Sequence, residues 1–428
     1  MGLGFDQPAK NNLKTSHLAG LVAGNTLEFY DFTIFLFFAP QIGASLFAGK
    51  SDGLLAALAA FAVGFLARPL GAAVIGRYGD RAGRKPAMLL SFSLMGGALL
   101  VIGLTPPASV LGIGSAIIVV LARLVQGFAL GGEVGPTTAL LIEAAPADRR
   151  GTYGAWQIAS QGVAVLSAGI VGLVISWMLP ASAVTDWGWR IAILLGAVLL
   201  PIGFYLRRII PETLHQGSTS ELESEDLPFA RVVVAGLVLI LSGTITNYTL
   251  QYFNTYTVSI LKLDTVTAFT TTAITGSCLF VFGLLGGWLS DRLGRRPLIV
   301  WPRIALLLLI YPIFVQITRY PSLATLAVGA FILTTLYALC TAPANVCLAE
   351  GFRRDRRSLG YALTYTLAVS IFGGSAQFLI AWMLKITGDP LVPAWWLMAA
   401  SVAGVVSGLA MPIAARQQEK RAGVPVAA

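Results

Sequence analysis

A ten-residue segment occurs twice in this chain. Residues 76–85 and 287–296 both fit the pattern G-x-x-x-D-R-x-G-R-[KR], and the copies begin 211 residues apart in a chain of 428. Each copy follows one apolar run and precedes another. A charged turn that recurs at about half the length of a very apolar chain indicates an internal duplication in a membrane protein.

The composition indicates that a lipid bilayer surrounds most of the chain. Hydrophobic residues make up 56% and charged residues only 11%, with a mean hydropathy of +0.78, whereas soluble domains carry about 25% charged residues. The three cysteines, Cys278, Cys340 and Cys347, lie in apolar runs without metal-ligand spacing, so we expect free core thiols. His17 and His215 lie at segment edges and are expected to be solvated. We therefore expect neither a metal nor a cofactor.

Twelve segments have the roughly 20 apolar residues that a membrane-spanning helix needs. They are 18–46, 54–77, 87–106, 111–136, 152–179, 190–208, 231–260, 266–288, 298–318, 322–346, 359–384 and 393–414. The polar, acidic stretch 209–230 separates two groups of six. The sequence thus predicts an all-α membrane protein with an N-terminal six-helix bundle (1–208), a linker (209–230) and a C-terminal six-helix bundle (231–428), related by pseudo-twofold symmetry.

The lysines and arginines predict the orientation of this bundle. Most of the 29 fall on the side that carries the repeated decamers, including four in 77–85 and four in 353–357. Positive charge marks the cytoplasmic side, so both termini and the linker are expected there. The net charge of +9 is then topogenic, and anionic lipid headgroups rather than nucleic acid are the expected partners.

At this point the motifs resemble those of the major facilitator superfamily, which carries the decamer between its second and third helices. Further segments are similar to its metabolite:proton symporter subfamily, namely 28–32 (EFYDF), 64–71 (GFLARPLG), 123–133 (RLVQGFALGGE) and 187–190 (WGWR). The resemblance implies two bundles around a central cavity, alternating access, a bacterial inner membrane and a monomer. It also implies a transporter rather than an enzyme.

Other segments bear on the substrate. Residues 156–161 (WQIASQ), 372–374 (FGG), 387–389 (TGD) and 395–398 (WWLM) look like those of citrate and tricarballylate symporters. Those transporters tend to have a tyrosine where Leu140 or Leu141 stands here. A di- or tricarboxylate such as citrate is the leading interpretation. A symporter of 2-oxoglutarate, an aromatic acid or a betaine is an alternative, and a membrane sensor that does not transport is a more distant one.

Ionisable residues at membrane depth are costly and usually functional. Away from the span ends, the first half contains five, Glu28, Asp31, Arg68, Arg123 and Glu133. We expect the second half to contain none and to supply only neutral recognition.

The positions of these charges predict a proton-coupling site. Glu28 and Asp31 share one helix face, which Asn25 continues. On the fourth helix, Arg123, Gln126 and Glu133 lie within an arc of roughly 80°, and we expect Arg123 to pair with Asp31. Protonation of Asp31 would then release Arg123 to bind a substrate carboxylate. Glu28 and Glu133 are further candidates for the residue that binds the coupling proton. Na⁺ in place of H⁺ as the coupling ion is not excluded.

Neutral polar side chains are predicted to line the substrate cavity. Together with Arg123, Arg68 and Asn25, the expected substrate-binding residues are Gln157, Ser160, Gln161, Asn247, Tyr248, Gln251, Tyr252 and Asn254. The alternative is that these groups form hydrogen bonds between helices. Arg68 is also the expected partner of Glu133. The glycine pairs 127/131 and 283/287 are expected to be close-packing seams.

The decamers are predicted to act in gating. Their carboxylates lie in glycine-containing turns near a helix start, where they can pair with the turn's arginines and with a facing helix N-terminus. Contacts of this kind between the halves would hold the cytoplasmic side closed. The expected gating residues are Asp80, Arg81, Arg84, Glu143, Arg150, Asp291, Arg292 and Arg295.

Overall fold

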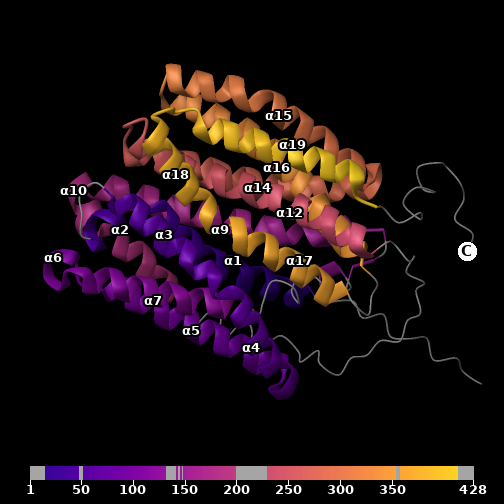
Figure 1. Cartoon of the computed structure of the whole chain (residues 1–428), viewed down its shortest axis with the longest axis horizontal. Coiled ribbons are helices and arrows are strands. Elements are labelled where there is room, and N and C mark those ends of the chain that lie inside the picture. Colours follow the sequence, from indigo (N-terminus) through magenta and orange to yellow (C-terminus); the bar gives the residue numbers. More distant parts are fainter. Residues whose placement is uncertain are drawn as a thin grey trace, which may run out of the picture.

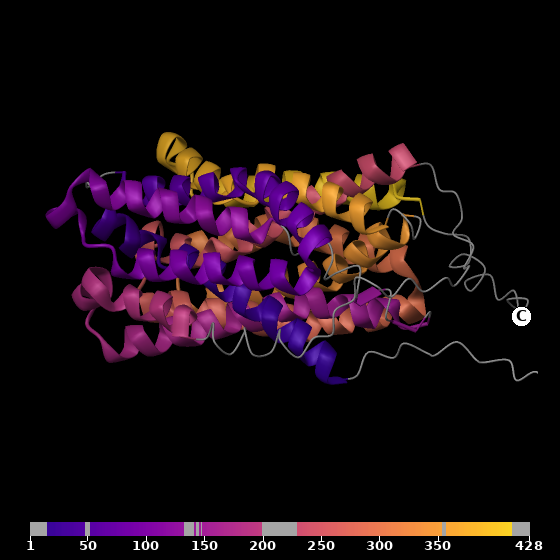
Figure 2. The same ribbon diagram turned by 90° about the horizontal axis from the view of Figure 1, so that it is seen from below.

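The computed structural model describes residues 15–47, 52–131, 141–142, 145–146, 148–198, 229–352 and 357–412. All regular elements within these ranges are helices, and most run roughly along the long axis of the molecule (Figures 1 and 2). Ten of them are long and apolar enough to cross a membrane, or eleven when one bent pair counts as a span. The prediction of an all-α, multi-pass membrane protein is confirmed.

The first half of the chain forms the lower part of the molecule in Figure 1. Its elements are α1 (Thr15–Phe37), α2 (Ala39–Leu46), α3 (Gly53–Leu66), α4 (Arg68–Ala82), α5 (Arg84–Leu104), α6 (Ala108–Leu111), α7 (Ile113–Leu130), α9 (Arg150–Met178), α10 (Ala181–Ala183) and the π-helical turn η1 (Val184–Gly188). Residues 189–198 continue as a helix. The rest of the predicted sixth span, and nearly all of the predicted linker 209–230, lie outside the described residues.

The second half forms the upper part of the same view. Its elements are α12 (Phe229–Gln251), α13 (Phe253–Ser259), α14 (Thr265–Leu293), α15 (Arg295–Arg319), α16 (Leu323–Glu350), α17 (Arg357–Phe372), α18 (Ser375–Thr387) and α19 (Val392–Ala410). The turns of both decamers lie toward the right of Figure 1, and α6 and α10 lie toward the left. We call these the decamer end and the far end.

Several predicted spans are interrupted rather than continuous. The first one, 18–46, bends by 65° between α1 and α2. Pro40 lies in the first turn of α2, where a missing N–H costs nothing, whereas a continuous helix would lose a hydrogen bond there. The spans 54–77, 231–260 and 359–384 break at Ala67, Tyr252 and the pair Gly373–Gly374. The last three still pass as single membrane spans, as predicted, and the local breaks inside them are features that mean hydropathy does not report.

Both decamers turn in the same way. The helix ahead of each turn ends and the next begins at a single glycine, Gly83 with φ 103° and Gly294 with φ 89°. Residues with a side chain rarely adopt such a φ, so the pattern requires glycine at this position. The repeated sequence therefore encodes a repeated backbone turn.

The glycine seams are real. A Cβ at Gly127 of α7 would overlap the carbonyl oxygen of Gly64 in α3, and one at Gly131 would overlap that of Arg68. Between the halves, α9 packs along α14, and a Cβ at Gly162 would overlap the backbone nitrogen of Phe280. Small residues therefore let backbones touch both within the first half and at the contact between the halves.

Gly127→Ala is expected to destabilise the protein by about 1–3 kcal/mol, because the added methyl overlaps backbone that cannot rotate away. The measurement is the thermal unfolding midpoint of the purified protein in detergent. Gly97→Ala is the matched control, since a Cβ at this helical glycine meets nothing within 4 Å. An unchanged midpoint for Gly127→Ala would contradict the packing of α7 on α3.

Candidate functional site

Asp31 is buried on α1, and its carboxylate is held by α7. The amide of Gln126 donates to both carboxylate oxygens, at 3.1 and 2.9 Å. Asp31 and Arg123 are each 2% exposed and lie within electrostatic range of one another. However, the Arg123 guanidinium stacks on the ring of Phe35, 3.6 Å from its centroid. The predicted direct pair is therefore wrong in detail: Gln126, one turn further along α7, makes the hydrogen bonds.

Arg123 keeps unused donors in this arrangement. Its Nε and Nη1 are buried and have no partner among the described residues. An unpaired guanidinium donor in a buried site is unfavourable. Arg123 is thus poised to bind a carboxylate, either that of Asp31 after a small movement or one from a bound anion.

A layer of aromatic rings separates Arg123 from a second buried arginine, Arg68 on α4. The Arg68 guanidinium lies 4.0 Å from the Phe65 centroid and 4.9 Å from that of Phe32. Tyr248 of the second half joins the layer, 6.0 Å from Phe65. Phe32 and Phe65 were not predicted as site residues, although they lie within the motifs that contain Asp31 and Arg68. Cation–π stacking stabilises a buried guanidinium.

Arg68 also lines a cavity between the halves. Helices α1, α4 and α9 contribute lining residues from the first half, and α12, α16 and α17 contribute the others. The polar members are Arg68, Gln161, Thr244, Asn247, Tyr248, Tyr337, Thr341, Asn345 and Tyr365. Glu28 lies within electrostatic range of Arg68. The predicted partner of Arg68, Glu133, lies outside the described residues.

The predicted polar face of α9 contacts α1. Asn25 donates to the hydroxyl of Ser160 at 2.5 Å, which ties the two helices together. Gln157 is 1% exposed, and neither atom of its amide has a partner among the described residues. Of the three predicted residues on α9, only Gln161 lines the cavity.

The break at Tyr252 divides the predicted polar stripe of the seventh span. Asn247 and Tyr248, before the break, line the cavity. Asn254, after it, donates to Thr272 of α14 at 3.1 Å. Gln251 and Tyr252 are buried outside the cavity lining. Hydrogen bonding between helices, the alternative interpretation, therefore describes Asn254.

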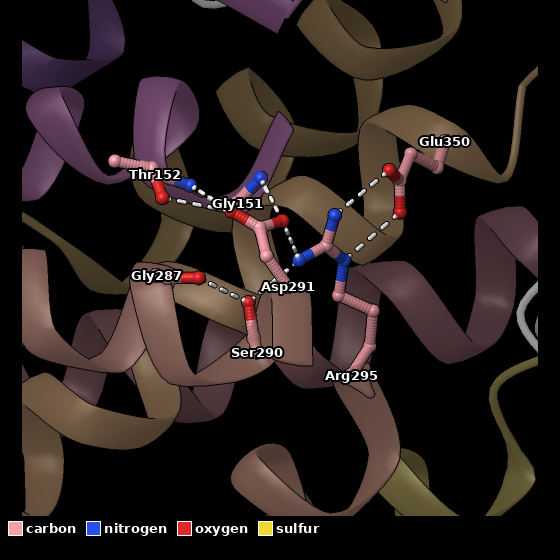
Figure 3. Close-up of polar contacts among 7 residues, drawn as sticks. All are labelled: Gly151, Thr152, Gly287, Ser290, Asp291, Arg295 and Glu350. Carbon is pink, nitrogen blue, oxygen red and sulfur yellow. Dashed lines mark hydrogen bonds and ion pairs between the residues drawn. The ribbon is translucent and has the colours of Figure 1, made fainter. Parts of the chain in front are cut away.

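Asp291 joins the halves at the decamer end (Figure 3). Its carboxylate accepts from the backbone N–H groups of Gly151 and Thr152 at 2.7 and 2.8 Å, and from the Thr152 hydroxyl at 2.8 Å. These donors belong to the first turn of α9. Asp291 lies near the end of α14, so a carboxylate of the second half caps a helix of the first, as the sequence predicted.

Arg295 anchors this carboxylate from the other side. Its Nη1 lies 2.8 Å from Asp291, while Nε and Nη2 form a fork on Glu350 at 3.2 and 3.1 Å (Figure 3). Two-point pairing of this kind fixes both partners. Glu350 is not among the gating residues that the sequence predicted.

The other predicted gating residues are less informative. Arg292 stacks on Trp288 with 4.0 Å to the ring centroid, Arg81 is exposed, and Arg150 is the half-buried first residue of α9. The side chains of Asp80, Arg84 and Glu143 lie outside the described part of the structure. The first decamer therefore has no described counterpart of the Asp291 contacts.

The two halves also contact one another at the far end. Lys385 at the end of α18 forms an ion pair with Asp52 at the start of α3. Phe38 and Phe269 pack with centroids 4.9 Å apart. Contacts between the halves are thus present at both ends of the cavity.

The second half does contain a buried charge, contrary to the expectation of neutral recognition there. Arg303 lies within the predicted span 298–318 and is 1% exposed. Arg303 can be read in the sequence of that span, so the expectation was wrong. Cys278, Cys340 and Cys347 are buried and free, as predicted. Among the residues that the structure describes, no three His, Cys, Asp or Glu side chains gather as metal ligands would.

Comparison with known proteins agrees with the fold. The Major Facilitator Superfamily model matches residues 21–374. A citrate-proton symporter of Salmonella typhi is 32% identical over 90% of this chain and 91% of its own length. A putative proline/betaine transporter of Staphylococcus aureus is 30% identical over 92% of this chain and 87% of its own.

Solved structures show the same architecture. The partially occluded, inward-open xylose transporter XylE of E. coli superposes with a TM-score of 0.73 over 92% of this chain and 96% of that one, at 17% identity. At that identity the likeness concerns the fold alone. The family model and the relatives above 30% identity carry the assignment: this chain is a member of the Major Facilitator Superfamily.

Proposed function

We propose that this protein is a proton-coupled symporter of a di- or tricarboxylate such as citrate, working by alternating access as a monomer in a bacterial inner membrane. Both termini would be cytoplasmic, so the decamer end would face the cytoplasm. No cofactor would take part, and H⁺ would be the coupling ion.

The observation that carries the proposal is the buried cluster of Asp31, Gln126 and Arg123 in the first half. Asp31 accepts two hydrogen bonds from Gln126, next to an Arg123 with unused donors. When the buried carboxylate of Asp31 binds a proton, it no longer attracts Arg123, which can then bind an anion. Binding of the proton and binding of the anion are thereby linked in one site. Ionisable groups in this position are functional by default in a membrane protein.

The substrate class is supported by the cavity and by the relatives. Arg68 lines a cavity with amide and phenol donors from both halves, and its buried Nε has no partner among the described residues. A polyanion needs this combination of one cation and many neutral donors. Citrate-proton symporters of Salmonella typhi and Klebsiella pneumoniae are 32% and 31% identical to this chain.

A second candidate is a zwitterion such as betaine. The putative proline/betaine transporter relative at 30% identity favours it, and so do the aromatic side chains of the cavity, Phe29, Tyr248, Tyr337 and Tyr365. Quaternary ammonium groups bind to such faces through cation–π contacts. A zwitterion also needs less positive charge than a trianion.

Uptake into proteoliposomes distinguishes the two. With radiolabelled citrate, 2-oxoglutarate and betaine, we expect citrate to accumulate only when the lumen is alkaline, by about tenfold per coupled proton and pH unit. A protonophore should abolish the accumulation. A sodium gradient without a pH gradient tests Na⁺ coupling, and protein-free liposomes give the background. Gradient-driven uptake of betaine with none of either carboxylate would establish the second candidate instead.

A further inference from the structure

Arg303 is a buried cation in the second half that the proposed cycle leaves unused. It lies on α15 and is 1% exposed. Its Nη1 donates to the hydroxyl of Ser242 on α12 at 3.1 Å, and its Nη2 to the Sγ of Cys340 on α16 at 3.6 Å. Neither partner is charged, and no carboxylate of the described residues pairs with Arg303. A guanidinium stays protonated inside proteins, so Arg303 carries a positive charge that no carboxylate of the described residues neutralises.

The two partners of Arg303 are next in sequence to residues that line the cavity. Ser242 precedes Gly243, and Cys340 precedes Thr341, both of which line the cavity. The Cys340 thiol also bonds the carbonyl of Tyr337, another lining residue, at 3.2 Å. Tyr337 itself lies within electrostatic range of Arg303. The guanidinium therefore bridges α12 and α16 one layer away from any bound substrate.

A glycine of the neighbouring helix α19 leaves space for the Arg303 guanidinium. A Cβ at Gly404 of α19 would collide with Nη1 of Arg303 and with the Ser242 hydroxyl. Ser242 in turn donates to the carbonyl of Ala400 on α19 at 2.6 Å. Four helices thus hold the guanidinium in place, although an apolar side chain would fill a site within a bundle at less cost.

We propose that Arg303 is a specificity-determining residue that selects substrates by their negative charge, acting across the cavity wall. The inference rests on the proposed function and extends it to the second half. A fixed buried cation attracts an anion in proportion to the anion's charge, and the low dielectric of the surroundings weakens this attraction little. A polyanion would then lie between Arg68 of the first half and Arg303 of the second.

The test is the KM of the purified protein in proteoliposomes for a mono-, a di- and a tricarboxylate. Arg303→Gln should raise KM roughly fivefold per substrate charge, hence about 25-fold for a dianion and about 125-fold for a trianion. Arg303→Lys keeps the charge and should retain most of the preference for the trianion. Ser242→Ala removes one bond but leaves the charge, so the ranking of the three substrates should be unchanged.

A purely structural role gives a different result. In that case both Arg303→Gln and Arg303→Lys would lower the transport rate, or they would raise KM by the same factor for all three substrates. Either result would overturn the inference and leave the proposed function intact. If Arg303→Gln does not fold, Gly404→Ala displaces the guanidinium without removing it and should raise KM more for the trianion than for the monoanion. Equal effects would again overturn it. Wild-type uptake of betaine but of no carboxylate would overturn the proposed function as well.

Discussion

Asp31→Asn is expected to abolish proton-driven accumulation while leaving exchange of substrate across the membrane. An asparagine can still accept a hydrogen bond from Gln126, so α1 and α7 remain joined, but it can neither bind nor release a proton. The accumulation ratio under a pH gradient of one unit should fall from about tenfold per coupled proton to about one. The measurement is gradient-driven uptake beside counterflow in liposomes preloaded with unlabelled substrate.

The control for this variant is Asp186→Asn, which neutralises an exposed acid at the far end. It should accumulate substrate as the wild type does. If Asp31→Asn accumulated substrate fully, Asp31 would have no part in coupling, and Glu28 would become the first candidate. If counterflow were lost as well, the carboxylate would be needed for binding or movement rather than for the proton.

Asp291→Asn is expected to open the decamer end. The carboxylate accepts three hydrogen bonds from the start of α9 and one from Arg295, and a neutral amide cannot replace its charge at the helix N-terminus. Charge-assisted bonds of this type contribute about 1–3 kcal/mol, which changes the ratio of closed to open states by roughly 5- to 150-fold. The lost free energy destabilises only the conformation in which the two halves are in contact at the decamer end.

Labelling of a single cysteine measures this shift. Ala155 is buried on α9 against Gly287, so a cysteine placed there, with the three native cysteines replaced by serine, reports opening of this contact. Maleimide labelling of Ala155→Cys should become faster when Asp291→Asn is added. Asp264→Asn is the matched control, because Asp264 caps its own helix α14 at the far end. Equal labelling rates with and without Asp291→Asn would refute the gating role.

The repeated turn shows how much a local pattern can predict. The decamer required glycine at positions 83 and 294, and both have positive φ. It also placed a carboxylate where a helix N-terminus could face it, and Asp291 makes that contact. The sequence did not indicate the fork of Arg295 on Glu350, because the two residues are 55 positions apart and nothing between them indicates how α15 and α16 pack together.

The candidate coupling site shows what the sequence pattern could not predict. Arg123 and Gln126 lie three residues apart on one face of α7, and either could have faced Asp31. The choice depends on how α1 packs against α3 and α7, where Phe35 covers the Arg123 guanidinium and leaves the carboxylate to Gln126. Arg68 likewise contacts Phe32 and Phe65 and lies near Glu28, a neighbour that no spacing rule predicted.

The sequence by itself determined that the chain spans a membrane many times, is duplicated, and buries acids and arginines in its first half. These features follow from composition, length and local turn chemistry, which act within a few residues. Only the tertiary structure decided which buried groups touch, that the halves meet through Asp291, and that Arg303 stands behind the cavity wall. Such contacts join helices far apart in the chain, and their energies depend on packing at the scale of single atoms.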